Sequence, residues 1–204
     1  MSSNSCVLHP NLLQVENLSG GPGTEAVFEN LSFSWPPGLS WIMGDEGTGK
    51  TSLLRILGGA LRPFSGSVHV SPGGVFWADL SHSTHDHLTV QACWDNLQSQ
   101  YPLWRSDLLE ALCQALDMER HRHKRLEMLS TGSRRKVTLI AALVSGATLT
   151  LLDQPFASLD SSSVRIVKDF LSEVADQNNR VWIVADYEVP EDLQLSSLLK
   201  LETR

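Results

Sequence analysis

The sequence predicts an α/β fold that starts with an antiparallel β part and carries an inserted α-helical subdomain at about residues 82–145. Two observations predict it. Apolar, strand-like runs occupy both ends of the chain, and a long helical pattern separates them. The chain has 204 residues, of which 42% are apolar and 19% are charged, a composition typical of one compact domain. We therefore expect residues 1–204 to form a single domain.

The first third of the chain contains strand-like runs separated by turn residues. Apolar and polar residues alternate over 27–35, which indicates a half-buried strand, and the unbroken apolar run at 39–43 indicates a buried one. Residues 19–23, Ser-Gly-Gly-Pro-Gly, are a dense turn signal. Further strand-like runs are at residues 12–15, 67–70 and 75–78, and the last two resemble a hairpin around Pro-Gly-Gly at 72–74.

Helical patterns dominate the rest of the chain, apart from two more buried strands. Apolar residues recur at three- and four-residue intervals over 52–61 and 108–116, as on one face of a helix. A third helix is expected at 161–174. The strands are expected at 148–152 and 181–184, where the runs are apolar and rich in β-branched residues.

Residues 44–51, Gly-Asp-Glu-Gly-Thr-Gly-Lys-Thr, form a complete P-loop between an apolar strand and a helix. Glycines let the backbone wrap around a phosphate chain with its N–H groups pointing inward. In this motif Lys50 reaches the terminal phosphates and Thr51 supplies a hydroxyl to Mg²⁺. A glycine-rich turn that binds nothing is the alternative, which the strand and helix context disfavours. The predicted nucleotide-binding residues are Gly44, Gly47, Thr48, Gly49, Lys50, Thr51 and Ser52.

Two later motifs indicate which P-loop family this is. Residues 129–133, Leu-Ser-Thr-Gly-Ser, precede three basic residues, and residues 151–160 read Leu-Leu-Asp-Gln-Pro-Phe-Ala-Ser-Leu-Asp. In this order after a P-loop, they resemble the Leu-Ser-Gly-Gly-Gln signature and the Walker B run of ABC transporter ATP-binding domains. The resemblance covers nearly the whole chain. Small exporter-type ATPases, such as the haem exporters of cytochrome c biogenesis, are the most similar, although residues 101–104 also resemble drug exporters.

The resemblance implies an ATP- and Mg²⁺-binding domain that pairs head to tail with a second ABC ATPase domain. Ser130 and Gly132 then contact ATP held by the partner domain, and Asp160 is expected to join the nucleotide site. Asp153 is expected to hold Mg²⁺ together with Thr51. In this family, closure of the two ATPase domains drives a movement of membrane-spanning partner subunits. The resemblance therefore implies a cytoplasmic protein that is peripheral on the inner face of a membrane through these partner subunits.

Several residues depart from the family pattern, and most of them stand at positions that the family uses for ATP hydrolysis. Gln154 stands where the family has a catalytic glutamate, and Asp186 stands where it has a switch histidine, with Tyr187 as the candidate if the alignment is shifted by one. The signature glutamine is Ser133, and Asp79 falls near an expected glutamine. One hypothesis is a subunit that binds ATP and hydrolyses it weakly or not at all. The other is an active ATPase with a substitute base such as Asp186.

Net charge, cysteine content and apolar runs limit the partners and compartments that the sequence suggests. A net charge of −7 gives no reason to expect nucleic acid as a partner, and three scattered cysteines fit a reducing cytosol. Residues 1–13 lack signal-peptide features, and no apolar run is long enough to span a membrane. If the chain works at a membrane, a partner must provide the span. A soluble ABC protein without transport function and a P-loop kinase remain as alternatives.

The sequence also contains four weaker signals. His82, His85 and His87 are candidate metal ligands, although a polar surface loop is the simpler interpretation. The basic run at 121–125 fits a solvated connection better than a nucleic-acid contact. Phe28 is a candidate for stacking on adenine. Finally, two tryptophans of the insert are candidates either for a membrane-subunit interface or for core packing: Trp94 and Trp104.

Overall fold

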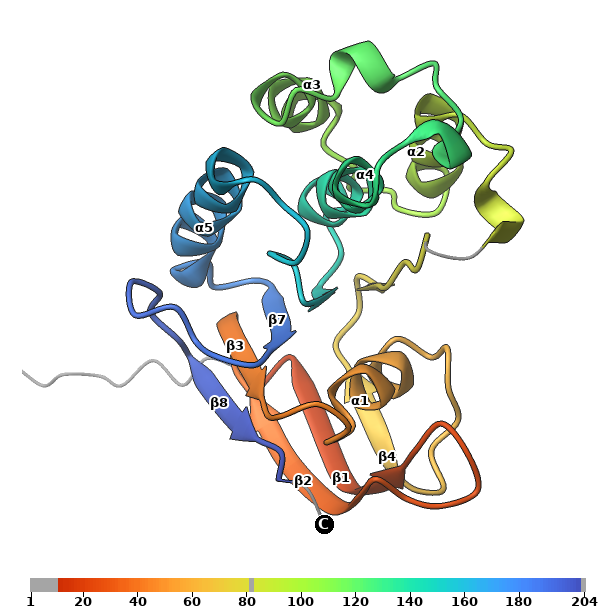
Figure 1. Ribbon diagram of the computed structural model, residues 1–204. Coiled ribbons are helices and arrows are strands. Elements are labelled where there is room, and N and C mark those ends of the chain that lie inside the picture. Colours follow the sequence, from red (N-terminus) through yellow and green to blue (C-terminus); the bar gives the residue numbers. More distant parts are fainter. Residues whose placement is uncertain (1–10, 81–82, 203–204) are drawn as a thin grey trace, which may run out of the picture.

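The computed structural model describes residues 11–80 and 83–202, which form two β-sheets and a group of helices (Figure 1). The first sheet is antiparallel, with the order β2-β1-β4. Its strands are β1 (Leu13–Gly20), β2 (Phe28–Trp35) and β4 (Ser65–Val70). β1 is longer than the predicted strand at 12–15, because it continues through two irregular pairings into the expected turn and ends at Gly20.

The second sheet is parallel, with the order β5-β6-β7-β3-β8. Its strands are β3 (Gly38–Met43), β5 (Val75–Phe76), β6 (Leu149–Asp153), β7 (Val181–Asp186) and β8 (Ser197–Lys200). The three central strands are almost entirely buried, which explains why their sequences are unbroken apolar runs rather than alternating ones. The predicted α/β fold class is therefore confirmed.

The predicted hairpin of residues 67–70 and 75–78 was wrong. β4 pairs with β1 in the antiparallel sheet, whereas β5 pairs with β6 in the parallel sheet. Gly73 and Gly74 both have positive φ angles, and their carbonyls accept hydrogen bonds from the amides of Thr148 and Leu149. The Pro-Gly-Gly turn is thus held against the start of β6 and carries the chain from one sheet to the other.

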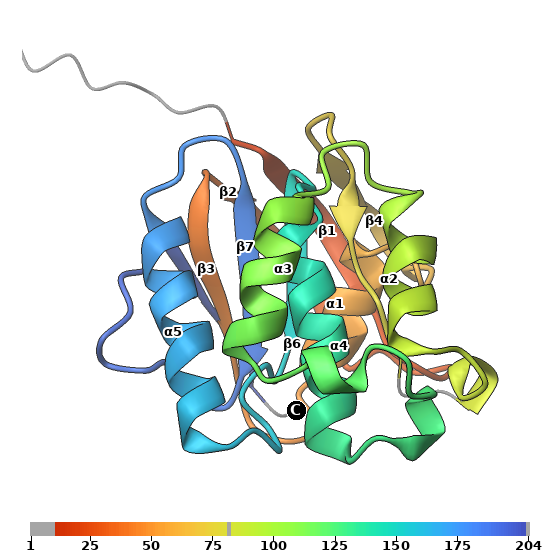
Figure 2. The ribbon, with the colours of Figure 1, turned by 90° about the horizontal axis from the view of Figure 1, so that it is seen from above.

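The parallel sheet has a separate apolar core on each face. On one face, α1 (Lys50–Leu57) lies between the parallel and antiparallel sheets, and Ile42 and Ile183 pack toward it. On the other face, Trp41 and Trp182 pack under α5 (Ser161–Ala175) and the helical insert. Figure 2 shows α3, α4 and α5 lying across this second face. The P-loop that precedes α1 therefore sits at the edge of the parallel sheet, between the two layers.

The helical insert follows β5 and ends before β6. Its helices are α2 (Val90–Gln98), α3 (Ser106–Ala115) and α4 (Thr131–Val144), with short 3₁₀ turns at Ser83–His85, Glu119–His121 and Leu126–Met128. Trp94 is fully buried, and its indole N–H donates to the carbonyl of Val137 at 3.0 Å. Trp104 is partly buried against the same core. Both tryptophans therefore pack into the insert, which fits the second of the two roles considered for them.

The basic run at 121–125 is largely neutralised by acidic neighbours. Arg122 forms an ion pair with Glu110, and Arg125 forms one with Glu127 at 3.5 Å. This arrangement matches a solvated connection. In the part of the chain that the structure describes, no helix combines the length and the apolar character that a membrane span requires.

Candidate functional site

The P-loop, Asp153 and Asp186 meet at one edge of the parallel sheet. Met43, the last residue of β3, is paired with Asp186, and Asp153 at the end of β6 is paired with Ala185. Because the carboxyl ends of parallel strands share an edge, three segments far apart in the sequence come together there. This edge is where open α/β sheets bind their ligands.

The backbone of the P-loop requires glycine at several positions. Gly47 and Gly49 have φ angles of 80° and 96°, which side chains of L-residues rarely adopt. A Cβ at Gly44 would lie 2.6 Å from the Leu201 carbonyl oxygen. Thr48 is 2% exposed and donates its hydroxyl to the Asp45 carbonyl at 2.9 Å, which holds the loop from inside. The loop is thus shaped as the motif predicts, with the amides at the start of α1 available to an anion.

Lys50 lies across the mouth of its own loop. Its Nζ donates to the carbonyls of Gly44 at 2.6 Å and Asp45 at 2.7 Å. The same Nζ lies 4.4 Å from the ring centroid of Tyr187, within the range of a cation–π contact. The lysine is only 6% exposed, so it is held at the loop before any phosphate reaches it.

A cavity of about 380 Å³ opens above the loop. Gly47, Gly49, Lys50, Thr51 and Ser52 line one side, and Gln154 and Tyr187 line it from the ends of β6 and β7. Apolar lining comes from Pro22 and Val27. Phe28 does not have the role considered for it, because it is 4% exposed and packs beneath Gly49. Pro22 and Val27 are therefore the apolar side chains of this cavity that an adenine ring could contact.

Asp153 and Thr51 have the arrangement that a magnesium ion needs. The Thr51 hydroxyl donates to Asp153 Oδ2 at 2.7 Å, whereas Asp153 Oδ1 is buried with no hydrogen-bond partner among the described residues. Burial raises the pKa of Asp153, and the Thr51 hydroxyl opposes this rise only in part. Mg²⁺ prefers hard oxygen ligands and would satisfy the unpaired oxygen. The residues present therefore fit the ion, with Asp153 and Thr51 as the groups that would hold it.

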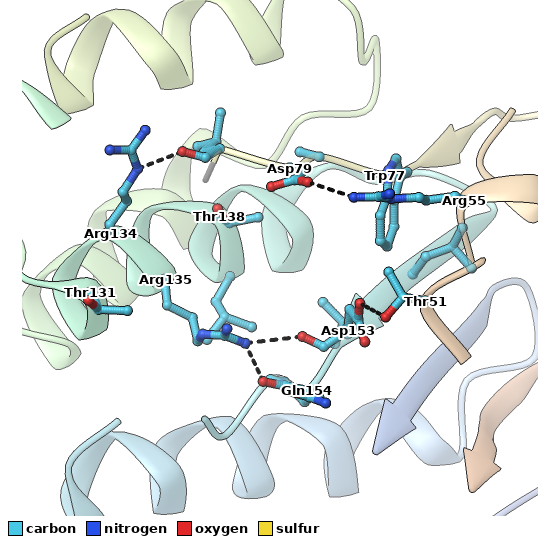
Figure 3. Close-up of a pocket in the computed structure, with 16 residues that line it drawn as sticks. Thr51, Arg55, Trp77, Asp79, Thr131, Arg134, Arg135, Thr138, Asp153 and Gln154 are labelled. Carbon is cyan, nitrogen blue, oxygen red and sulfur yellow. Dashed lines mark hydrogen bonds and ion pairs between the residues drawn. The ribbon is translucent and has the colours of Figure 1, made fainter. Parts of the chain in front are cut away.

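Gln154 adopts a left-handed backbone conformation, with a φ angle of 45°. Its amide donates to the Ala185 carbonyl at 2.8 Å. Arg135, from α4, donates to the Gln154 carbonyl and to the Asp153 carbonyl, the latter at 3.1 Å. Figure 3 shows the guanidinium of Arg135 reaching these two carbonyls. The residue after Asp153 is thus held from β7 and from the helical insert at once. The sequence did not single out Arg135 as a functional residue, although it lies in the basic run after the signature.

Asp186 and Tyr187 differ in how they face the cavity. The Asp186 carboxylate accepts a hydrogen bond from the Tyr187 backbone N–H at 2.8 Å and is not among the groups that line the cavity. Burial raises the pKa of Asp186, while this N–H and the charges of Lys50 and Arg135 act in the opposite direction. Tyr187 does line the cavity. The one-residue shift considered for this position was the only sequence signal for it.

The predicted signature residues lie away from the P-loop cavity of their own chain. Ser130 is exposed and caps α4, where its hydroxyl accepts from the Ser133 amide at 3.2 Å. Gly132 approaches the Ser158 carbonyl so closely that any side chain there would clash. Neither Ser130 nor Gly132 lines the cavity over the P-loop. The start of α4 therefore faces outward, where it is accessible to a second molecule.

Asp160 is engaged in local contacts at the start of α5. Its carboxylate accepts from the Ser162 hydroxyl at 2.6 Å, the Ser163 amide at 2.9 Å and Lys136 Nζ at 3.0 Å. These contacts, with Ser162 first, hold the pKa of Asp160 well below its usual range. In this chain Asp160 does not line the nucleotide cavity and instead ties α5 to α4.

A second cavity of about 280 Å³ lies on the other side of Thr51, between α1, residues 77–80 and α4 (Figure 3). Arg55 and Asp79 form an ion pair across it, with 3.4 Å between Nη2 and Oδ2. Arg134 donates to the Leu80 carbonyl at 2.6 Å. Asp79, which falls near the position of the expected glutamine, is therefore engaged with Arg55.

The histidines do not form a metal site within the described residues. Across 11–80 and 83–202, no three His, Cys, Asp or Glu side chains gather in a group that could hold a metal ion. His82 lies outside the described residues, and His85 and His87 belong to no such group.

Known proteins are similar to this chain in sequence and in fold. The family model described as ABC transporter matches residues 28–157. The cytochrome c biogenesis ATP-binding export protein CcmA of Rhodobacter capsulatus is 33% identical over 156 residues, which cover 76% of this chain and 72% of that protein. The CcmA protein of Chelativorans sp. is 35% identical over 161 residues, covering 74% and 79% respectively.

Solved structures agree at the level of the fold. A putative ABC transporter ATP-binding protein from Pyrococcus furiosus superposes with a TM-score of 0.73 at 21% identity, covering 93% of this chain and 96% of that one. An ATP-binding cassette solved as a dimer with ADP and Pi gives a TM-score of 0.72 at 18% identity, covering 86% and 88%. The family match decides against the P-loop kinase alternative. With its P-loop, its Asp153 site and its signature helix in the expected order, the chain belongs to the ABC transporter family as an ATP-binding domain.

Proposed function

We propose that this chain is the ATP-binding subunit of a membrane exporter and that it hydrolyses ATP weakly or not at all. It works at the cytoplasmic face of a membrane, where it pairs with a second ABC ATPase domain and with membrane-spanning subunits. One observation carries the proposal. A complete phosphate cavity has an amide, Gln154, at the position that follows Asp153.

The geometry of the cavity supports ATP binding. Gly47 and Gly49 leave the loop backbone open to phosphate oxygens, and Lys50 is already held at the loop. Asp153 and Thr51 provide oxygen ligands for Mg²⁺, which neutralises phosphate charge when it is bound. These groups bind and orient the nucleotide without any contribution from Gln154.

The loss of a base supports weak hydrolysis. A glutamine amide does not accept a proton from water at neutral pH, and a positioned general base typically contributes about 10²- to 10⁴-fold in rate. Asp186 is the candidate for a substitute base. Its carboxylate, however, accepts a hydrogen bond from the Tyr187 backbone N–H and does not line the cavity. Among the described residues that line this cavity, Glu46 of the P-loop is the only one with a carboxylate side chain.

The relatives support a role in export. The CcmA proteins are named as ATP-binding export proteins of cytochrome c biogenesis, and their match extends over about three quarters of this chain. The outward-facing Ser130 supports pairing with a second ATPase domain, because it lies away from the cavity of its own chain. The alternative is a fully active ATPase that uses Asp186 as its base. The raised pKa that burial gives to this carboxyl favours that alternative.

The test compares ATP turnover by the native chain, Gln154→Glu and Asp186→Asn. We expect slow native turnover, a gain of about 10²-fold or more in Gln154→Glu and no change in Asp186→Asn. Brisk native turnover that Gln154→Glu does not increase would overturn the proposal of weak hydrolysis. Loss of that turnover in Asp186→Asn would then identify the aspartate as the base.

A further inference from the structure

We propose that the second cavity, of about 280 Å³, is a binding site for a small organic carboxylate, which Arg135 and two threonine hydroxyls of α4 would hold. This site is separate from the cavity over the P-loop, and its assignment does not depend on ATP binding. The wall formed by α4 carries hydrogen-bond donors that the described residues leave without acceptors.

One face of α4 borders the cavity with polar side chains. Thr131, Arg135 and Thr138 follow one another at four- and three-residue intervals, so they share one face of the helix. All three line the cavity, and Figure 3 shows them along α4 at its border. A ligand in the cavity therefore meets a row of three side chains that each carry a hydrogen-bond donor.

Arg135 keeps one edge of its guanidinium without a partner. Both of its hydrogen bonds, to the carbonyls of Asp153 and Gln154, are made by Nη1. Within residues 11–80 and 83–202, neither Nε nor Nη2 of Arg135 has an acceptor. Nε and Nη2 form the fork that binds a carboxylate through two parallel hydrogen bonds. Arg105 uses this fork in the same chain, donating to both carboxylate oxygens of Asp107 at 2.9 and 2.6 Å.

Two threonine hydroxyls beside Arg135 are also available. Thr51, which lines the cavity as well, donates its hydroxyl to Asp153 at 2.7 Å. By contrast, the hydroxyls of Thr131 and Thr138 donate to no residue in the part of the chain that the structure describes. Each oxygen of a carboxylate can accept more than one hydrogen bond, so one carboxylate can satisfy the fork and a hydroxyl together.

The charges of the lining favour an anion. Five charged side chains line the cavity, three of them arginines and two of them aspartates: Arg55, Arg134, Arg135, Asp79 and Asp153. Arg55 forms an ion pair with Asp79, and both acceptors of Arg135 are neutral carbonyls. Positive charge is therefore in excess on the side of α4, where the unpaired donors lie.

The other walls favour a ligand that has an apolar body beside its anionic group. Trp77 is partly buried, and three leucines of the lining are almost fully buried: Leu139, Leu151 and Leu152. Inorganic phosphate would leave these side chains without contacts, whereas an aromatic or aliphatic carboxylate would cover them. A volume of about 280 Å³ lies just below the usual range for drug-sized ligands, so the ligand is a small molecule.

Benzoate is the probe, because it joins a carboxylate to a flat apolar ring. It is titrated into the isotope-labelled full chain while NMR follows the backbone amides of α4. We expect saturable shifts with a dissociation constant of about 1–10 mM, a typical affinity for a molecule of this size. Benzyl alcohol has the ring without the charge, and inorganic phosphate has charge without the ring. Each should bind about tenfold more weakly or less well still.

Two variants test the donors. Arg135→Lys keeps the positive charge and removes the fork, and we expect about tenfold weaker benzoate binding. Thr138→Val keeps the shape of the side chain and the carbonyl contacts of Arg135, and we expect about threefold weaker binding. If Arg135→Lys does not fold, Thr138→Val still tests the site. Arg165→Lys, on the exposed face of α5, is the matched control and should bind benzoate as the native chain does.

The cavity over the P-loop is the competing location for the probe. Benzoate binding that persists in saturating Mg-ATP and in Lys50→Ala supports the proposed site. If Lys50→Ala abolishes binding while Arg135→Lys and Thr138→Val leave it unchanged, benzoate occupies the P-loop cavity and the assignment is wrong. Absence of saturable shifts up to about 50 mM benzoate would overturn the assignment as well.

Discussion

At the scale of single residues, Arg135 is the side chain that joins the helical insert to the end of β6. It donates to the carbonyls of Asp153, the predicted Mg²⁺ ligand, and of Gln154, which stands at the position of the family's catalytic glutamate. Gln154 also has an uncommon left-handed backbone, which persists only where its surroundings hold it. The guanidinium is well suited to this, because its planar fork can satisfy two neighbouring acceptors.

Replacing Arg135 should therefore destabilise the chain. Arg135→Met keeps the length of the side chain but leaves two partly buried carbonyls without a charged donor, and we expect a loss of about 1.5–3 kcal/mol in the free energy of unfolding. Urea unfolding followed by circular dichroism measures this loss. Arg165→Met on the exposed face of α5 is the control and should change little. Equal small changes in both variants would show that the Arg135 contacts do not hold this region.

The P-loop was predictable residue by residue, whereas Arg135 was not, and Tyr187 was a candidate only through a one-residue shift of the alignment. Gly47 and Gly49 are required by their own φ angles, a local property that the motif encodes directly. The contacts of Arg135 and Tyr187 depend on how α4 and β7 approach the P-loop in space. The same distinction explains the assignment of Asp186. Its position in the sequence suggested a place at the phosphate, and only the backbone direction after β7 shows that Tyr187 lines the cavity.

At the scale of elements, one acidic residue, Asp160, links the start of α5 to α4. Asp160 caps the start of α5 and forms an ion pair with Lys136 of α4 at 3.0 Å. Both contacts favour the carboxylate over the carboxylic acid. Since the pKa of Asp160 is lower in the folded chain than in the unfolded chain, its contribution to stability is present above the ordinary aspartate range. That contribution is lost as the pH falls from there toward the lower folded value.

The variant Asp160→Asn isolates the charge, because asparagine is an equally good N-cap. We expect a melting temperature lowered by about 1–3 °C at pH 7. Below about pH 4 the difference should shrink, since the unfolded native chain then takes up a proton that the folded chain does not. Asp169→Asn, on an exposed position of the same helix, should show no such pH dependence. A constant difference from pH 7 to pH 3 would contradict this role of the charge.

The elements themselves were predictable where the local pattern was strong. Continuous apolar runs predicted β3, β6 and β7, because strands buried on both faces need no polar side. β8 was missed, since it has four residues and alternates at the sheet edge. The pairing of β5 with β6 also escaped prediction. The turn between β4 and β5 is fixed by contacts with Thr148, which is more than 70 residues away in the sequence.

At the scale of the whole molecule, the order of motifs predicted the fold class, and the separation of the two functional edges within one chain came only from the family resemblance. The P-loop lies at the carboxyl end of the parallel sheet, and Ser130 lies on an exposed helix start of the insert. A nucleotide bound at the first edge does not meet the second edge of the same chain. Two copies arranged head to tail would bring each Ser130 to the other copy's cavity, which is the arrangement that the family resemblance implied.

Slow hydrolysis makes this pairing measurable in the native chain. Weak turnover leaves ATP intact, so we expect the purified chain to be monomeric without nucleotide and dimeric with Mg-ATP, as measured by sedimentation velocity. Ser130→Asp keeps an N-cap but brings a negative charge toward the partner's phosphate. It should abolish the ATP-dependent dimer and change ATP binding by the monomer less than about threefold, because Ser130 does not line its own cavity.

Ser130→Asn supplies the control that decides between charge and structure. Asparagine also caps the helix and carries no charge, so its dimerisation should be weakened far less than that of Ser130→Asp. Equal loss in both variants would mean that the shape of the helix start matters and that a facing phosphate does not. A native chain that binds ATP and stays monomeric at all concentrations would contradict pairing between identical copies. The second ATPase domain would then have to come from a different chain.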